Sequence, residues 1–314
     1  MKKSYILLLI VFTAINCPEV TTKSPKINQP KIKNILIGIE PYPAGFFHNM
    51  IGVINKLNWA DQFDLTPVVY WGPSSQYYQK EGYNGATDPW EYYFAPVSSV
   101  TYEEVIGKSE TIIAQDRHEA PDMSRVPATD CDIIGYHKIL DRDYRRSIKR
   151  IIDKYIKIKP VILDKVDTFC LKNFSGKKTI GIHLRGTDKE SEAIPVPIDR
   201  ICSEANAMAD QIQADQFFIA TDDTSLLTKA EQLLKRPIIT YDSYRGSGKK
   251  GIHLSHNHDY SKAKLGEEVL IEALLLSRCD KFIHTRSNVS SAVLLFNPEL
   301  DNTVLYDVHR CPLK

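Results

Sequence analysis

From residue 179 to residue 296 the chain alternates short apolar runs with segments of helical length, and this alternation restricts the fold more than any other feature. The apolar runs cover residues 179–184, 217–220, 237–241 and 281–285. The helical segments cover residues 198–214, 224–234 and 265–276, and a further one begins at Asn288. Strands and helices that alternate in this way form βαβ units around a parallel sheet. We therefore predict a doubly wound α/β sheet for the second half of the chain.

The first half of the chain begins with the same kind of pattern. An apolar run at residues 34–40, a helical pattern at 46–57 and a second apolar run at 65–71 predict a β-α-β unit. Between residues 72 and 130 the sequence is rich in Tyr, Pro, Gly and Trp and shows little periodicity. A charged segment with helical spacing, residues 141–170, then leads into the second half. The chain is long enough for two domains of about 150 residues each.

The composition excludes one class of partner. The 314 residues include 40 Lys and Arg and 39 Asp and Glu, so the net charge is +1. Nucleic-acid-binding domains generally carry a clear basic excess. Because this chain has none, we expect no nucleic-acid partner.

The N-terminus differs from the rest of the chain. Lys2 and Lys3 precede an apolar run at residues 5–15, and a polar stretch follows through Lys33. A short positive region before an apolar run of this length is typical of a secretory signal. We predict that residues 1–22 are a signal peptide or a membrane tether, which places the protein in the secretory-pathway lumen or on a membrane. The alternative is an apolar terminus without a targeting role.

The densest polar cluster follows the apolar run at residues 179–184. His183 and Arg185 are two residues apart, so both side chains leave the same face of the strand. A guanidinium group presents a planar fork of donors that fits phosphate oxygens. Gly186 lets the backbone approach a ligand closely, and Asp188 either orients Arg185 or caps a turn. The cluster predicts a site for a phosphorylated ligand, and its alternative interpretation is a surface turn with an ion pair.

Two further polar loops follow strands of the same predicted sheet. Asp223 is predicted to cap the next helix, whereas Asp222 either binds a ribose or a base or takes the cap itself. Ser287 and Asn288 begin the last helix, and a helix N-terminus offers N–H groups and a positive dipole end to phosphates. Ordinary capping by Ser287 or Asn288 is compatible with that role.

Sequence signatures of several other sites are absent. No Gly-x-Gly-x-x-Gly or P-loop sequence follows a predicted strand, and no paired cysteines or Cys/His cluster indicates zinc. The loop at residues 243–264 contains His253, His256 and His258, whose spacing allows a metal site, but a flap over a nucleotide is the preferred interpretation. We expect neither a metal nor an organic cofactor.

Three aromatic residues, Trp90, Tyr92 and Tyr93, lie in the irregular stretch of the first half. Exposed aromatic rings combine a large apolar face with a polar edge, which suits stacking on sugar rings. These residues are therefore candidates for binding a carbohydrate acceptor. In an alternative of equal weight, the rings pack over the edge of the sheet.

Three motifs, in this order, resemble those of the fucosyltransferase superfamily that includes α1,6-fucosyltransferases, rhizobial chitin-oligosaccharide fucosyltransferases and protein O-fucosyltransferases. Residues 183–189 (His-x-Arg-Gly-Thr-Asp-Lys) are similar to the arginine motif, and residues 220–227 (Ala-Thr-Asp-Asp-x-Ser-Leu-Leu) to the second motif. The third motif extends from Glu272 to Asn288. The similarity is specific over residues 175–295 and looser over residues 34–130.

The resemblance implies a GT-B-like α/β fold in which two Rossmann-like domains with parallel sheets face each other. Residues 23–165 would form the acceptor-side domain, and residues 166–314 the domain that binds the GDP-sugar. The implied activity is metal-independent, inverting transfer of fucose from GDP-fucose. The implied partners are the nucleotide-sugar donor and a glycan or glycoprotein acceptor.

The resemblance also implies roles for individual residues. His183 and Glu272 would lie near the guanine, and Arg185 would bind the β-phosphate and offset the charge of the departing GDP. The further donor-binding residues would be Gly186, Thr187, Asp188, Asp222, Ser287 and Asn288. Glu192 is the implied catalytic base, with Glu190 as its competitor. The α1,6 enzymes have a second arginine where this chain has Gly186, so the motif does not identify the acceptor.

Two other functions are compatible with these motifs. Phosphate contacts do not identify a sugar, so a GT-B glycosyltransferase with these residues could use another nucleotide sugar. A non-catalytic carbohydrate-binding protein derived from such an enzyme would instead bind sugar through Trp90, Tyr92 and Tyr93, without affinity for nucleotides.

Overall fold

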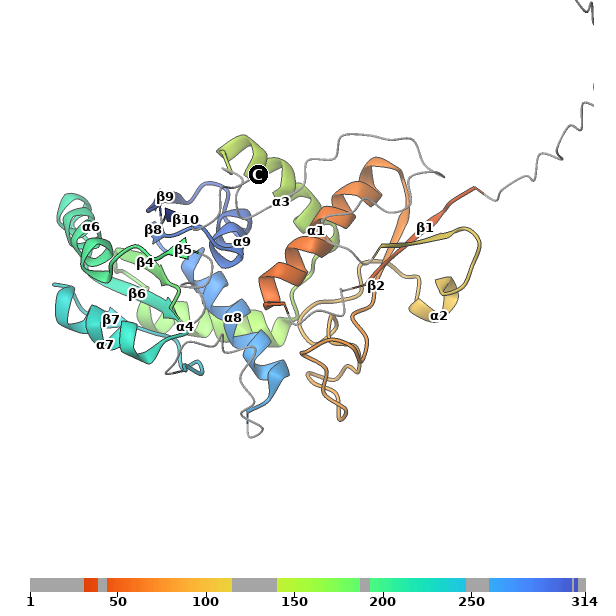
Figure 1. Ribbon diagram of the computed structural model, residues 1–314, viewed down its shortest axis with the longest axis horizontal. Coiled ribbons are helices and arrows are strands. Elements are labelled where there is room, and N and C mark those ends of the chain that lie inside the picture. Colours follow the sequence, from red (N-terminus) through yellow and green to blue (C-terminus); the bar gives the residue numbers. More distant parts are fainter. Residues whose placement is uncertain are drawn as a thin grey trace, which may run out of the picture. The chain divides into compact units, whose positions relative to one another are not determined.

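The computed structural model of the protein describes residues 31–38, 44–114, 140–186, 193–246, 260–306 and 308–309. The chain divides into two units, Met1–Lys31 and Ile32–Lys314, and the described helices and strands belong to the second (Figure 1). The predicted signal segment, residues 1–22, lies outside the described residues. None of the described helices is both long enough and apolar enough to cross a membrane.

The first half of the second unit contains a parallel sheet of three strands. β1 (Asn34–Ile37) lies between β2 (Thr66–Val69) and β3 (Thr111–Ala114) and is parallel to both. α1 (Phe46–Gln62) connects β1 to β2, and the short α2 (Tyr102–Val105) precedes β3. The predicted β-α-β unit is confirmed, and β3 is an addition in the stretch where the sequence predicts no regular element.

The second half is built on a parallel sheet of five strands in the order β7-β6-β4-β8-β9. These strands are β4 (Thr179–Leu184), β6 (Gln216–Thr221), β7 (Ile238–Ile239), β8 (Lys281–His284) and β9 (Asp301–Val304). The helices of this half are α6 (Ile198–Ile212), α7 (Thr224–Leu233), α8 (Lys262–Leu276) and α9 (Asn288–Phe296). Outside this sheet, β5 (Ala193–Ile194) pairs antiparallel with β10 (Val308–His309). The predicted α/β fold with parallel sheets is confirmed.

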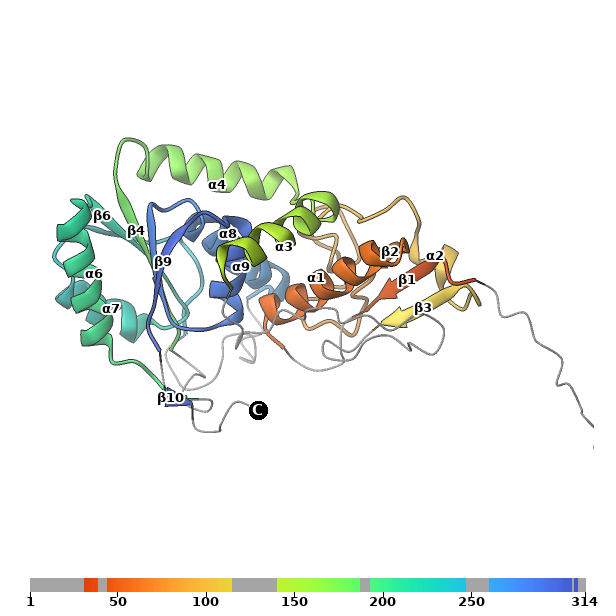
Figure 2. The same ribbon diagram turned by 90° about the horizontal axis from the view of Figure 1, so that it is seen from above.

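Two helices lead from the first half to the second. α3 (Arg142–Tyr155) is capped by Asp141, whose side chain accepts a hydrogen bond from Tyr144 N at 2.9 Å. α4 (Pro160–Asn173) begins with a proline, which suits the first turn because an N–H there has no helical partner. α3 packs against α1 and α9, and α4 packs against α8 (Figure 2). The connector therefore contacts helices of both halves.

The central strands of the larger sheet are covered on both faces. Every residue of β4 and β6 is buried. Ile180 and Phe217 belong to an apolar cluster with residues of α6, whereas Phe218 belongs to a cluster with residues of α8. Gly181 pairs in register with Phe218, and side chains alternate between the faces of a strand. Gly181 and His183 therefore face α8.

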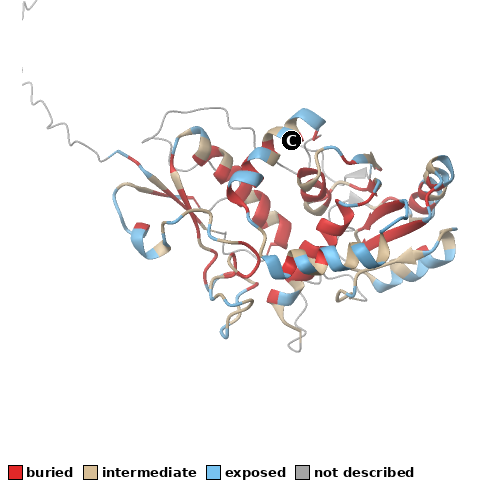
Figure 3. Ribbon diagram, turned by 180° about the vertical axis from the view of Figure 1, so that it is seen from behind, coloured by how far each residue is buried: buried red, intermediate tan, exposed pale blue. Residues whose placement is uncertain are grey.

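One apolar cluster extends through both halves. It joins Phe47 of α1 to Phe218 and Phe282 of the larger sheet, and the ring centroids of Phe47 and Phe296 are 6.2 Å apart. Buried positions are red in Figure 3. The expected boundary between the acceptor-side and donor-side domains, at residue 165, falls inside α4 and stays a prediction.

The aromatic segment of the first half is part of this core. Trp90, Tyr92 and Tyr93 are fully buried. The hydroxyl of Tyr93 donates to Ala263 O at 2.9 Å, and that of Tyr92 donates to Gln79 O at 3.0 Å. The prediction that these three residues bind the acceptor is wrong, because a buried ring offers no face to a sugar. The alternative, a set of packed aromatic rings, is confirmed.

The contact between Gly266 of α8 and Tyr93 gives a first testable prediction. A Cβ on Gly266 would lie 2.8 Å from Tyr93 Cζ and 3.2 Å from Phe46 Cδ2. We expect Gly266→Ala to lower the free energy of unfolding by about 1–3 kcal/mol, because overpacking outweighs the better helix propensity of alanine. Urea denaturation measures this change. Gly45→Ala is the control, since a Cβ there meets nothing within 4 Å, and equal stability of both variants would contradict the prediction.

Candidate functional site

Polar residues meet where β4, β6 and β8 end. β4 lies between β6 and β8 and is parallel to both, so the three strands end at one edge of the sheet (Figure 1). Arg185 and Gly186 follow β4, Asp222 follows β6, and Ser287 and Asn288 stand at the start of α9 after β8. Ligands of open α/β sheets bind outside this edge. The structure thus brings these five residues together where a ligand is expected.

Asp222 joins the loops that follow three strands. Its Oδ1 accepts a hydrogen bond from Gly186 N at 3.0 Å, and its backbone O accepts one from Gly246 N, in the loop after β7, at 2.9 Å. The helix cap is formed by Asp223 instead, whose Oδ1 accepts from Ser225 N at 2.7 Å. The predicted cap by Asp223 is confirmed, and the capping alternative for Asp222 is wrong.

Gly186 has no room for a side chain. A Cβ at this position would lie 2.7 Å from Asp223 Cβ and 2.8 Å from Leu226 Cδ1. The backbone after β4 therefore passes directly against the start of α7, and only glycine permits that approach. This close passage positions Arg185, the preceding residue, whose side chain is half-buried at the same edge.

Glu272 lies on α8 at the level of the end of β4. Leu276, one helical turn later, packs against Gly181, where a Cβ would lie 3.0 Å from Leu276 Cδ2. A crossover helix runs antiparallel to its strands, and four residues of helix and two residues of strand both span about 6 Å. Glu272 is therefore level with His183, which faces α8 from β4.

The carboxylate of Glu272 is buried and is held by the loop after β7. Ser243 Oγ donates to Glu272 Oε1 at 2.6 Å, and Arg245 Nη2 is 3.5 Å from the same oxygen. Burial raises the pKa of Glu272 to about 7, and the charges of Glu268 and Asp222 add to the rise, while Ser243 and Arg245 oppose it. The carboxyl group of Glu272 therefore keeps a proton to higher pH than an exposed glutamate does.

Sequence reasoning missed Ser243 and Arg245 as candidate functional residues. Arg245 Nη2 also donates to Tyr241 O at 2.9 Å, which holds the guanidinium against its own loop. The sequence does contain one signal, because α8 is apolar around Glu272, and a carboxylate buried there requires a donor or a cation from elsewhere. That signal predicts a partner without identifying the segment that supplies it.

Ser287 caps α9. Its Oγ accepts a hydrogen bond from Ser290 N at 3.0 Å, and Ser287 N donates to Ser290 Oγ at 2.9 Å. The capping alternative for Ser287 is thus confirmed, and its hydroxyl is buried within the cap. Contacts from α9 to an anion would therefore come from backbone N–H groups of the first turn, which begins at Asn288.

Several predicted residues lie outside the described residues. These are Thr187, Asp188, Glu190, Glu192, His253, His256 and His258. Their roles stay predictions. Within the described part of the chain, no group of three or more His, Cys, Asp or Glu side chains could hold a metal ion.

The chain is similar to known proteins in its fold, but not at the level of sequence. No protein-family model matches the chain, and no curated protein sequence matches it. Among solved structures, NodZ alpha-1,6-fucosyltransferase co-crystallised with GDP is similar with a TM-score of 0.50 and 17% identity, over 85% of this chain and 93% of that chain. POFUT1 in complex with GDP-fucose is similar with a TM-score of 0.50 and 10% identity, over 87% and 98% of the two chains. Over most of its length the chain therefore has the α/β fold of GT-B fucosyltransferases.

The raised pKa of Glu272 predicts a pH-dependent effect on stability. The folded protein binds this proton more tightly than the unfolded chain, so the stability that the group contributes is complete below pH 4.5 and is lost as the pH rises through about 7. Glu272→Gln does not titrate, so we expect its free energy of unfolding to rise relative to wild type between pH 5 and pH 8, by up to about 3 kcal/mol.

Urea unfolding of both proteins at pH 5, 6, 7 and 8 measures this difference. Glu204→Gln, on the exposed side of α6, is the matched control and should keep the wild-type dependence on pH. If the free energies of unfolding of wild type and Glu272→Gln changed equally with pH, this would contradict the assignment of a buried, proton-binding carboxyl group.

Proposed function

We propose that this protein is a glycosyltransferase that transfers fucose from GDP-fucose to a hydroxyl group of a glycan or protein. The observation that carries the proposal is the sheet edge where Arg185, Gly186 and Asp222 meet. Support comes from the fold, which is shared with two fucosyltransferase structures that contain GDP or GDP-fucose. At the same edge lie an arginine, a glycine whose backbone a ligand can approach closely, and the N-terminus of α9.

The diphosphate would bind beyond the ends of β4 and β8. Arg185 would place its donor fork on the phosphate oxygens. Gly186 would let the chain approach them, and the N-terminus of α9 would add N–H donors and its positive dipole end. These groups lie on neighbouring strands, so one diphosphate could contact all of them.

The base would bind on the side of β4 that faces α8. The edge of guanine carries adjacent N–H donors, which a carboxylate accepts, and Glu272 is the buried carboxylate at that level. Uracil instead presents a single N–H between two carbonyl groups, and a carbonyl facing a carboxylate leaves two acceptors unpaired. The site would therefore prefer GDP over UDP.

Transfer would proceed with inversion at the anomeric carbon. The acceptor oxygen forms a bond to C1 of fucose, the bond from C1 to the β-phosphate oxygen breaks, and the hydroxyl proton passes to a general base. Arg185 would offset the negative charge that develops on the departing GDP, a task that other sites assign to a metal ion. Glu192 is the proposed base and Glu190 its competitor.

We propose no residue that binds the acceptor. The buried rings of Trp90, Tyr92 and Tyr93 also remove the surface on which a non-catalytic, sugar-binding function would depend. The relative affinities for GDP, GDP-fucose and UDP distinguish GDP-fucose from another nucleotide sugar as the donor. We further propose that residues 1–22 export the protein or tether it to a membrane, which cleavage analysis of the expressed chain would test.

Loss of the Arg185 side chain tests the donor site. We expect Arg185→Ala to weaken binding of GDP and GDP-fucose by roughly 10- to 100-fold, because a charge-assisted pair with phosphate is lost. Transfer should be abolished while the fold is kept. Calorimetric titration of the full-length protein with GDP, GDP-fucose, UDP and GMP, without added metal, measures the affinities.

Arg278→Ala is the matched control for Arg185→Ala. Arg278 has a half-exposed side chain and an ion pair with Asp167 at 3.5 Å, away from the sheet edge. The Arg278→Ala variant should bind GDP with the affinity of wild type. Failure of the wild type to bind any guanine nucleotide would overturn the proposed donor, and tight UDP binding would replace GDP-fucose by another nucleotide sugar.

The proposed base is tested by a pair of isosteric variants. We expect Glu192→Gln to reduce kcat by at least about 100-fold, the usual contribution of a general base, with unchanged GDP-fucose affinity. Glu190→Gln is the control and should retain most of the activity. The reverse pattern would assign the base to Glu190, and full activity of both variants would exclude this segment as the source of the base.

A further inference from the structure

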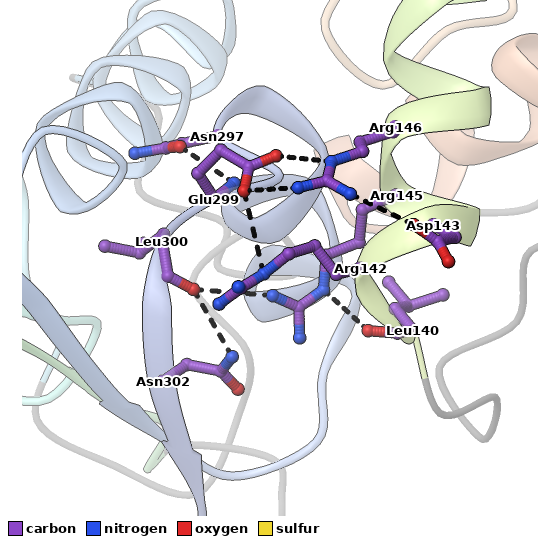
Figure 4. Close-up of polar contacts among 9 residues, drawn as sticks. All are labelled: Leu140, Arg142, Asp143, Arg145, Arg146, Asn297, Glu299, Leu300 and Asn302. Carbon is purple, nitrogen blue, oxygen red and sulfur yellow. Dashed lines mark hydrogen bonds and ion pairs between the residues drawn. The ribbon is translucent and has the colours of Figure 1, made fainter.

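Three arginines of α3 have different environments (Figure 4). Arg146 is half-exposed and forms a two-bond pair with Glu299, with its Nε 2.6 Å from Oε1 and its Nη2 2.8 Å from Oε2. Arg142 lies 3.7 Å from the same carboxylate. Arg145 is only 9% exposed and turns inward, where its Nε donates to Leu140 O at 2.6 Å. Among the described residues, the hydrogen-bond partners of Arg145 therefore lie inside the protein.

Two further groups accept from Arg145 inside the protein, Leu300 O at 3.4 Å and the side chain of Asn302 of β9. A guanidinium is only a donor, so the amide oxygen of Asn302 must face it. In that orientation the oxygen accepts from Arg145 Nη1 at 3.2 Å and from Nη2 at 3.0 Å. The amide nitrogen then donates to His284 Nε2 at 3.2 Å. Arg145 thus determines which end of the amide points at the histidine.

His284 connects the oriented amide of Asn302 to the edge of the sheet where the candidate site lies. Its Nδ1 is 3.0 Å from Thr285 O, which accepts only, so Nδ1 carries the proton and Nε2 accepts from Asn302. Burial lowers the pKa of His284, which keeps the ring neutral, as this arrangement requires. The ring also stacks on Phe282 with a centroid distance of 4.5 Å. A single tautomer is therefore fixed from both sides.

The hydrogen bonds from Arg145 through Asn302 and His284 to Thr285 O form a relay. This relay ends at the turn between β8 and α9. Thr285 O accepts a second hydrogen bond, from Ser290 Oγ at 2.9 Å. Ser290 is also the partner of Ser287 in the cap of α9. The carbonyl that His284 holds is therefore tied directly to the cap.

We propose that Arg145 is a positioning residue for the candidate phosphate-binding end of α9, acting through Asn302, His284 and Thr285. A donor-only group stands at one end of this relay and an acceptor-only carbonyl at the other, so every hydrogen bond between them has one direction. Arg145 belongs to the connector between the two halves of the chain, and α3 packs on both α1 and α9. The relay thus makes the geometry of the donor site depend on the docking of α3.

The first test observes the imidazole of His284 in the full-length protein. Long-range 1H–15N correlation spectra distinguish protonated from unprotonated ring nitrogens, and a His284→Gln variant assigns the signals. We expect wild type to carry the proton on Nδ1 alone. Asn302→Asp keeps the shape of the side chain but places an acceptor opposite Nε2, so Nε2 should become protonated.

Arg145→Met should disturb the same signals, because it removes the donors that face the Asn302 amide oxygen and leaves the amide nitrogen able to bond to Leu300 O instead of His284, so His284 should lose its single tautomer. Arg146→Met, one residue further along α3, is the matched control and should leave the tautomer unchanged. An unchanged tautomer in both Arg145→Met and Asn302→Asp would overturn the relay.

The second test measures GDP affinity by calorimetry and rests on the proposed function. We expect Arg145→Met to bind GDP about fivefold more weakly, the effect of one lost hydrogen bond, and Arg146→Met to bind as wild type does. Arg145→Lys retains a donor toward Asn302 and should recover part of the affinity. Equal affinity of Arg145→Met and wild type would overturn the positioning role. If wild type does not bind GDP, the proposed function fails, and the tautomer still decides whether the relay exists.

Discussion

β4 is buried on both faces, and this burial governs where polar residues can lie in the larger sheet. A strand covered by α6 on one side and α8 on the other has no room for charge along its length, so its polar residues gather at its carboxyl end. Neighbouring parallel strands end at the same edge, which brings Arg185, Gly186 and Asp222 together. The site is thus a consequence of how the sheet is covered.

Buried carboxylates on α8 connect segments that are distant in the sequence. Each finds donors from elsewhere in the chain: Glu267 is paired with Lys165 and Asn84, Glu268 with Tyr244 N and Tyr260, and Glu272 with Ser243 and Arg245. A carboxylate left unpaired in such a place would be strongly destabilising. α8 therefore packs the apolar core with one set of residues and holds the loops around the candidate site with another.

Strongly periodic elements were predictable, and elements without periodicity were not. β4 has the predicted bounds because its six residues are an apolar run, and α7 begins where the cap by Asp223 predicts it. β9 has the sequence Asp-Asn-Thr-Val, which is polar, and it was missed because it pairs only at the edge of the sheet. Trp90, Tyr92 and Tyr93 were misassigned because composition does not tell a buried ring from an exposed one.

The α/β architecture, the ends of the central strands and the polar residues that follow them can be predicted from the amino-acid sequence, because they depend on local periodicity and capping. The pairing of groups that are distant in the chain depends instead on the folded structure: Gly186 pairs with Asp222, Glu272 with Arg245, and Asn302 with both Arg145 and His284. The physical reason is that a buried polar group requires a partner, but the sequence does not say which of the many candidates lies within hydrogen-bonding distance. That choice is made only when the sheets and helices pack.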